Sequence, residues 1–113
     1  DFVYVGDLVR AVVRAVDGTG TGAYHFSSGS DIAVLDLYNA IVDGLGITPE
    51  LPVEIRPAHA DDAPSILLDP TRTFQDFGAI EFTPLEVLVA NSIEYYREFG
   101  AGDGHTHLKA TKS

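Results

Sequence analysis

The sequence predicts an α/β fold built from short β-strands and amphipathic helices. Short β-prone runs lie between longer stretches whose apolar residues recur at helical spacing. The length of 113 residues provides room for a single hydrophobic core. Hydrophobic residues make up 45% of the chain and charged residues 21%, which is the balance of a soluble globular protein rather than a disordered one.

The first helix is predicted after Asp7, a suitable N-cap, and it ends at Asp17 and Gly18. Arg10 and Arg14 lie four residues apart and therefore share one face, while apolar residues surround the rest of the helix. This pattern predicts a mostly buried helix with a narrow solvent-exposed stripe.

The second helix is predicted after another candidate N-cap, Asp31, and Gly44 and Gly46 close it. Its apolar positions match helical spacing: Ile32, Val34, Leu35, Leu37, Tyr38, Ile41, Val42 and Leu45.

Two further helices are predicted in the second half of the chain. Residues 70–78 begin with proline and end with glycine, which is typical of a short helix. In the last helix Thr83 is the cap, Pro84 takes the first position and Gly100 marks the end. Its apolar face comprises Leu85, Leu88, Val89, Ile93 and Tyr96.

The β-prone runs outside these helices predict four short strands. They occupy residues 2–5, 23–26, 53–55 and 66–68. Residues 56–64 are too irregular for either kind of element, because they combine two prolines with charged side chains.

The charge and the composition exclude several classes of partner. The formal net charge is −10, from 17 acidic and 7 basic residues, so the surface repels nucleic-acid backbones. No apolar run can span a membrane, and no secretory leader is visible. The chain has no cysteine, so it has no disulfides or thiolate metal sites, and we expect it in the cytoplasm.

Three patterns that resemble functional motifs are better explained by ordinary structure. The glycines at positions 18, 20 and 22 follow a predicted helix and precede a strand, whereas a dinucleotide-binding loop leaves a strand and opens a helix. We therefore expect a simple turn. His105 and His107 lie in a polar tail without a third ligand, so no metal site is predicted. Adjacent carboxylates such as Asp61 and Asp62 point apart, which makes a shared-proton pair a poor interpretation.

Arg56 is the best candidate for ligand binding from the residues alone. Basic side chains are scarce in this chain, and this one lies in the proline-flanked irregular segment. A guanidinium there can bind a phosphate with a nearby carboxylate orienting it, although a solvated loop is the simpler alternative. No Gly-x-Ser-x-Gly elbow and no His-Glu-x-x-His pair is present.

Four segments, in order, resemble the extended short-chain dehydrogenases/reductases, and in particular the NAD-dependent nucleotide-sugar epimerase/dehydratase family. Residues 1–9 (DFVYVGDLV) are similar to that family's Asp-Phe-Val-Tyr-Val-Asp-Asp-Leu segment, and residues 23–29 (AYHFSSG) are similar to its Tyr-Asn-Val-Gly-Ser-Gly strand. Residues 66–72 (ILLDPTR) are similar to its Asp-x-(Ser/Thr)-(Lys/Arg) segment. Residues 82–97 are similar to its last helix. The resemblance covers about residues 1–100.

This resemblance implies a C-terminal fragment of a Rossmann-type enzyme with its small substrate-binding lobe. Residues 1–30 would be the last helix and strand of the Rossmann-type domain, and residues 31–100 mainly the C-terminal substrate-binding lobe. Residues 101–113 would be a polar tail. The chain starts at Asp1 and contains no methionine, so we expect a longer protein upstream.

The resemblance also implies a function for the full-length protein. It would be a cytoplasmic, homodimeric epimerase of the UDP-sugar 4-epimerase type that uses NAD bound by the N-terminal part. The family's catalytic Tyr-x-x-x-Lys is absent, because no tyrosine here has lysine four residues later, so the fragment alone is not expected to catalyse. A dehydratase or decarboxylase of the same family, or a non-catalytic acidic binding module, remain alternatives.

The family's substrate-binding lobe usually places an arginine on the diphosphate and an aspartate on the nucleotide sugar. By this resemblance Asp62 would be the aspartate and Arg56 the phosphate ligand. The family often has arginine three residues before the aspartate, where this chain has His59, so either the loop is longer or His59 substitutes. Gly6 also replaces an aspartate usual before Asp7, which indicates a subfamily with different substrates.

Overall fold

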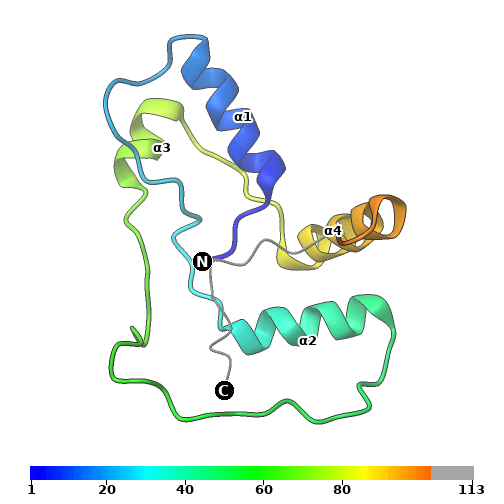
Figure 1. Cartoon of the computed structure of the whole chain (residues 1–113). Helices are drawn as coiled ribbons and strands as arrows, with labels where there is room; N and C mark the ends of the chain where they lie inside the picture. The colour runs from blue at the N-terminus through cyan, green and yellow to red at the C-terminus, as the bar shows by residue number, and fades with distance from the viewer. Residues whose placement is uncertain (103–113) are drawn as a thin grey trace.

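The computed structural model of the chain describes residues 1–102 and contains four α-helices joined by irregular segments (Figure 1). Their bounds are α1 Val5–Val16, α2 Val34–Leu45, α3 Thr71–Phe77 and α4 Leu85–Phe99. All four helices were predicted, and each predicted position agrees with the observed one to within a few residues. None of the helices in the described residues is long and apolar enough to cross a membrane.

The four predicted strands are wrong for this structure, because residues 1–102 contain no β-strand. The β-prone runs at 23–26, 53–55 and 66–68 are instead irregular segments, and Val5 opens α1. A strand satisfies its backbone N–H and C=O groups by pairing with a neighbouring strand. No such neighbour lies beside these runs within the described residues, so β-propensity alone does not produce a sheet.

Helix α1 exposes the residues that the sequence predicted to be buried. Val9, Val12 and Val16 lie on one stripe at helical spacing, and Val16 is 81% exposed. The opposite side faces the rest of the chain, where the Arg14 guanidinium lies over the ring of Phe77 at 5.9 Å. The prediction of a mostly buried helix is therefore wrong here, because nothing in the described residues covers its valine stripe.

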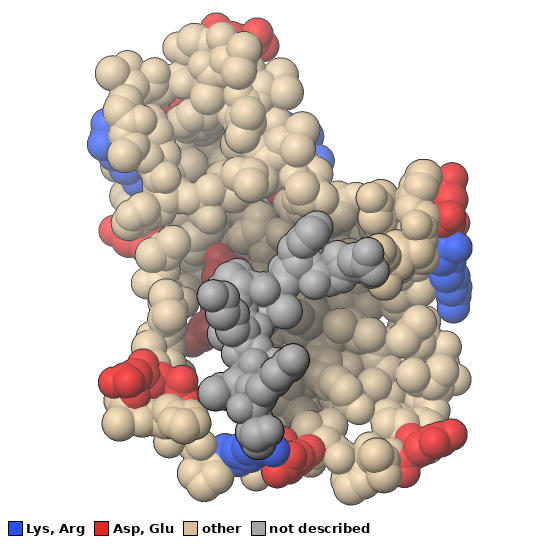
Figure 2. Space-filling view, in the orientation of Figure 1, with Lys and Arg blue, Asp and Glu red and all other residues tan. Residues whose placement is uncertain are grey.

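Uncovered apolar surface is a feature of the whole described chain. Only two apolar side chains in residues 1–102, those of Phe77 and Val89, are buried. The face in Figure 2 is correspondingly dominated by uncharged residues, with acidic and basic groups mainly at its edges. The exposed large apolar residues belong to α1, to α2, to α4 and to the segment between α2 and α3.

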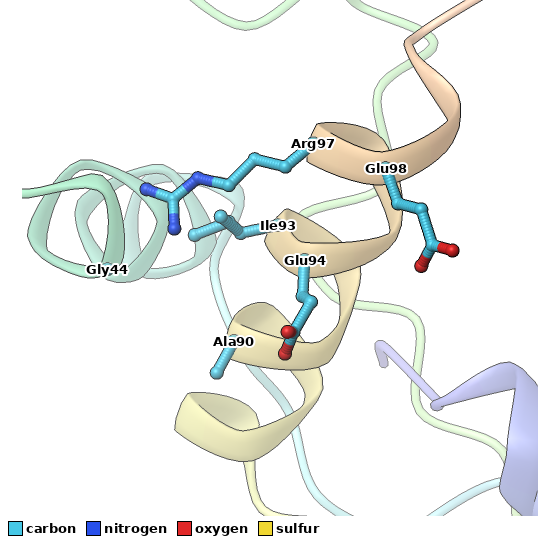
Figure 3. Close-up of a pocket in the computed structure, with 6 residues that line it drawn as sticks. All are labelled: Gly44, Ala90, Ile93, Glu94, Arg97 and Glu98. Carbon is cyan, nitrogen blue, oxygen red and sulfur yellow. The ribbon is translucent and has the colours of Figure 1, made fainter.

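Helices α2 and α4 pack along each other and form the most extensive helix contact of the described chain (Figure 1). The contact is close because position 44 of α2 has no side chain. A Cβ atom there would lie 2.9 Å from Cδ1 of Ile93 and 3.2 Å from Cγ1 of Val89. Figure 3 shows Ile93 and Arg97 reaching from α4 toward this part of α2. Gly44 is thus a packing residue inside the helix, and only Gly46 is the predicted terminator, in the left-handed conformation.

The predicted N-caps are displaced by tertiary hydrogen bonds. Helix α2 begins after Ala33, whose backbone N–H donates to the Asp36 carboxylate at 3.2 Å, while Asp31 accepts a hydrogen bond from Ser65. The residue before α4 is Pro84, and Thr83 instead bonds to Asp7. The sequence located these helices correctly but assigned their caps wrongly, because the side chains have partners distant in sequence.

The glycine-containing turn after α1 is fastened to α3. The Arg72 guanidinium donates to the carbonyl oxygens of Thr21 and Ala23, at 2.7 and 3.2 Å, and lies over the Tyr24 ring at 4.7 Å. The Tyr24 hydroxyl accepts from the Thr21 N–H at 2.8 Å and donates to the Asp76 carboxylate. The turn follows a helix and does not open one, as the sequence predicted.

Gly20→Ala is expected to destabilise the protein more than Gly18→Ala. Both glycines have positive φ, +80° and +98°, so alanine at either position is strained by about 1–2 kcal/mol. At Gly20 the added Cβ would also lie 2.8 Å from the Phe77 ring, whereas at Gly18 no atom lies within 4 Å. Urea unfolding of both variants beside the wild type measures the difference. Equal losses would show that the contact with the Phe77 ring contributes nothing.

Candidate functional site

The start of α1 and the segment that leads into α4 meet at the buried carboxylate of Asp7. This side chain is 1% exposed and lies in the first turn of α1. It accepts hydrogen bonds from the backbone N–H of Thr83 at 2.7 Å and from its hydroxyl at 2.8 Å. The Arg10 guanidinium completes the set at 2.6 Å. Asp7 therefore joins the start of α1 to the segment that leads into α4, and it is not the N-cap that the sequence predicted.

These hydrogen bonds also determine the protonation of Asp7. Burial by itself raises the pKa of a carboxyl group, but here the donors from Thr83 and Arg10 outweigh burial. The pKa of Asp7 consequently lies below its ordinary value of 3.8. Because the carboxylate is the form that accepts these bonds, protonation of Asp7 weakens the junction.

The stability that Asp7 contributes is expected to disappear in acid. A group whose pKa is lower in the folded than in the unfolded state stabilises above its unfolded pKa and loses this effect as the pH falls through its folded pKa. The difference in unfolding free energy between wild type and Asp7→Asn should therefore shrink below about pH 4. Urea unfolding at several pH values measures it, and a difference that stays constant into acid would contradict the role of the carboxylate.

Asp1 joins the first segment to the serine-rich segment after residue 26. Its carboxylate accepts hydrogen bonds from the Ser27 hydroxyl, the Ser28 N–H and the Ser28 hydroxyl, each at 2.7 Å. Ser27 is fully buried. A cavity of about 190 Å³ lies beside this junction. It is lined by Phe2, Val3, Tyr4, Asp7, Ser28, Ser30, Ile32, Phe82, Thr83, Pro84 and Leu85. Segments predicted as separate motifs thus meet at one place.

The predicted ligand-binding residues lie in the long segment between α2 and α3, which runs along the outside of the molecule (green in Figure 1). Arg56 makes a two-pronged ion pair with Glu54: Nε donates at 2.9 Å and Nη2 at 2.8 Å. The hydrogen bond with Glu54 raises the pKa of Arg56. The side chains of Arg56 and Glu54 are 78% and 70% exposed, so the guanidinium is accessible to a ligand from solvent.

His59 and Asp62 come together in a tight turn. The His59 N–H donates to the Asp62 carboxylate at 2.7 Å, and the Asp62 N–H donates to the His59 carbonyl at 3.0 Å. Both residues are exposed. Arg56 forms no salt bridge with Asp62, since within the described residues its carboxylate partner is Glu54. The structure therefore brings two of the three predicted residues together and pairs the third with a residue that the sequence analysis did not select.

Glu54 could have been found from its spacing. Two residues apart in an extended segment lie on the same face, so a glutamate two positions before an arginine is within reach of it. The pairing of Asp7 with Thr83 has no comparable local signal, because the two residues are distant in sequence. Among residues 1–102 no cluster of side chains could hold a metal ion, and His105 and His107 lie outside the described residues.

The chain is similar to two solved enzymes of Bordetella bronchiseptica. The match to WbmH, whose structure is in complex with NAD⁺, has 60% identity and a TM-score of 0.80 over 88% of this chain. The chain belongs to the extended short-chain dehydrogenase/reductase family. A second member, WbmG, in complex with NAD and UDP, matches at 26% identity and a TM-score of 0.67 over 89% of this chain. No protein-family model and no curated protein matches the sequence.

The chain spans about one third of each family member, 33% of WbmH and 34% of WbmG. The family resemblance that the sequence predicted is thus confirmed. The Rossmann-type sheet itself is absent from residues 1–102.

Proposed function

We propose that this chain is the substrate-binding part of an NAD-dependent enzyme that modifies a nucleotide-linked sugar, and that the reaction is 4-epimerisation of a UDP-sugar. The observation that carries the proposal is the 60% identity to WbmH, a structure in complex with NAD⁺, over 88% of this chain. The UDP in the WbmG structure supports a uridine nucleotide as the carrier of the sugar. Epimerisation is a common outcome in the family, and this precedent supports the choice of reaction.

The division of labour follows from the residues that are present. No segment of residues 1–102 forms a glycine-rich turn between a strand and a helix, so these residues do not fit an NAD site. NAD would bind to a part of the protein outside this chain. The tyrosine and the lysine that carry the chemistry would belong to that part as well. Residues 1–30 would join that part, and residues 31–100 would form mainly the substrate-binding lobe.

Within this lobe Arg56 would bind the diphosphate. A guanidinium presents a planar fork of N–H donors that matches two phosphate oxygens, and it stays charged at neutral pH. The exposed position of Arg56 leaves it within reach of a ligand. Asp62 is oriented by the His59 N–H through Oδ2, so its other oxygen can accept a hydrogen bond from a hydroxyl of the nucleotide sugar. His59 would thus position the acceptor.

The test is turnover by the intact protein that carries this sequence. Purified protein is incubated with NAD and UDP-sugars, and the products are identified by NMR and mass spectrometry. An epimer of unchanged mass supports the proposed reaction. Loss of water or of carbon dioxide would identify a dehydratase or a decarboxylase instead. Light scattering on the same sample tests the proposed homodimer.

A simpler observation separates an enzyme from a binding module. The reading frame upstream of Asp1 should encode a glycine-rich turn and a Tyr-x-x-x-Lys pair if the proposal is right. A start codon close to Asp1, together with no turnover, would overturn it.

A further inference from the structure

The Arg56 guanidinium, which is proposed to bind phosphate, is paired with a carboxylate in this structure. Glu54 presents two carboxylate oxygens to the Nε and Nη2 edge of Arg56, at 2.9 and 2.8 Å. This is an edge that a carboxylate or a phosphate group uses in a two-pronged contact. A phosphate group and the Glu54 carboxylate therefore compete for the same donors.

The contact between Glu54 and Arg56 is local in sequence. The two residues are separated by one position in an extended segment, so their side chains share a face and meet without help from the rest of the fold. Residues 51–69 are all exposed, and within the described chain no other carboxylate forms a salt bridge with Arg56. In the absence of a ligand, Glu54 is thus the carboxylate that pairs with Arg56.

We propose that Glu54 is an internal competitor that Arg56 must release before it binds the diphosphate, so that Glu54 sets the affinity of the site for nucleotides. This inference rests on the proposed function, because it assumes that Arg56 contacts the diphosphate. Exposed ion pairs are weak, so the contact restrains binding without blocking it. A negative charge next to a site for an anion also repels the ligand, which acts in the same direction.

The experiment measures UDP binding by the intact protein through calorimetry. Glu54→Gln keeps the shape of the side chain but removes its charge, and it is expected to tighten UDP binding roughly two- to five-fold. Glu50→Gln is the matched control, because it removes a charge from the same exposed segment without a contact to Arg56, and its affinity should stay near that of the wild type. In an Arg56→Ala background the effect of Glu54→Gln should shrink, because only the direct repulsion between the Glu54 charge and the ligand remains.

The outcomes separate this inference from the proposed function. If wild-type protein does not bind UDP, the proposed function fails and this inference fails with it. If the wild type binds UDP and Arg56→Ala weakens binding, but Glu54→Gln leaves the affinity unchanged or lowers it, only this inference is overturned. A lower affinity would show that Glu54 holds Arg56 in place for the ligand. An equal gain from Glu50→Gln would assign the effect to overall charge and would also overturn it.

Discussion

Arg56→Ala is expected to weaken UDP binding by the intact protein about 10- to 100-fold, because hydrogen bonds between charged groups are stronger than those between neutral groups. The guanidinium would form such bonds with the diphosphate, and alanine has no donor to replace them. Because the Arg56 side chain is 78% exposed, its removal is not expected to disturb folding, so a loss of UDP affinity would come from the site itself. Calorimetric titration with UDP measures the affinity directly.

A matched control is available on the surface of α4. Arg97 is exposed and lies near Gly44, Glu94 and Glu98 (Figure 3), and it forms no salt bridge within the described residues. Arg97→Ala removes the same charge from the protein and should leave UDP binding unchanged. If both alanine variants lose affinity equally, the effect comes from net charge. If neither loses affinity, Arg56 is not the phosphate ligand.

Asp7→Ala is expected to lower the free energy of unfolding by about 3 kcal/mol, because it removes a buried carboxylate that satisfies several donors. The Thr83 N–H and hydroxyl lose their acceptor, and the Arg10 guanidinium loses its partner. The junction between α1 and the start of α4 depends on these contacts. Urea unfolding of the intact protein measures the change.

Variants of Arg10 and Thr83 measure how much each partner of Asp7 contributes to the free energy of unfolding. Arg10→Ala removes an exposed partner, so its cost should be at most about 1 kcal/mol. Thr83→Val removes the hydroxyl donor but keeps the backbone N–H bond to Asp7. Its loss of unfolding free energy should therefore lie between those of Arg10→Ala and Asp7→Ala. An Asp7→Ala variant no less stable than Arg10→Ala would show that the buried hydrogen bonds contribute little.

The helices were predictable because helix formation depends on nearby residues. The 3.6-residue spacing of apolar positions indicated α2 and α4, and the glycines at 46, 78 and 100 mark the observed helix ends. The caps were less predictable, since Asp7 and Thr83 bond to each other across the fold and not to their own helix ends. A capping pattern in the sequence identifies a side chain that can bond to its own helix end. It does not show whether that side chain bonds instead to a residue distant in sequence.

The candidate site was only partly predictable. Arg56 attracted attention because basic residues are scarce, and His59 and Asp62 followed from the family resemblance. The turn joining His59 to Asp62 and the ion pair joining Arg56 to Glu54 became visible only in the structure. Composition identifies a side chain able to bind phosphate, but its present partner depends on the path of the backbone.

By itself, the sequence determined the number and position of the helices in residues 1–102, the absence of disulfides, and the family to which the chain belongs. These properties depend on local spacing, on composition, and on short motifs read in order. Only the tertiary structure decided that residues 1–102 form no sheet, that the valines of α1 face outward, and that Asp7 and Asp1 hold distant segments together. These properties depend on which surfaces come into contact, and strand pairing and burial require partners that a single segment cannot supply.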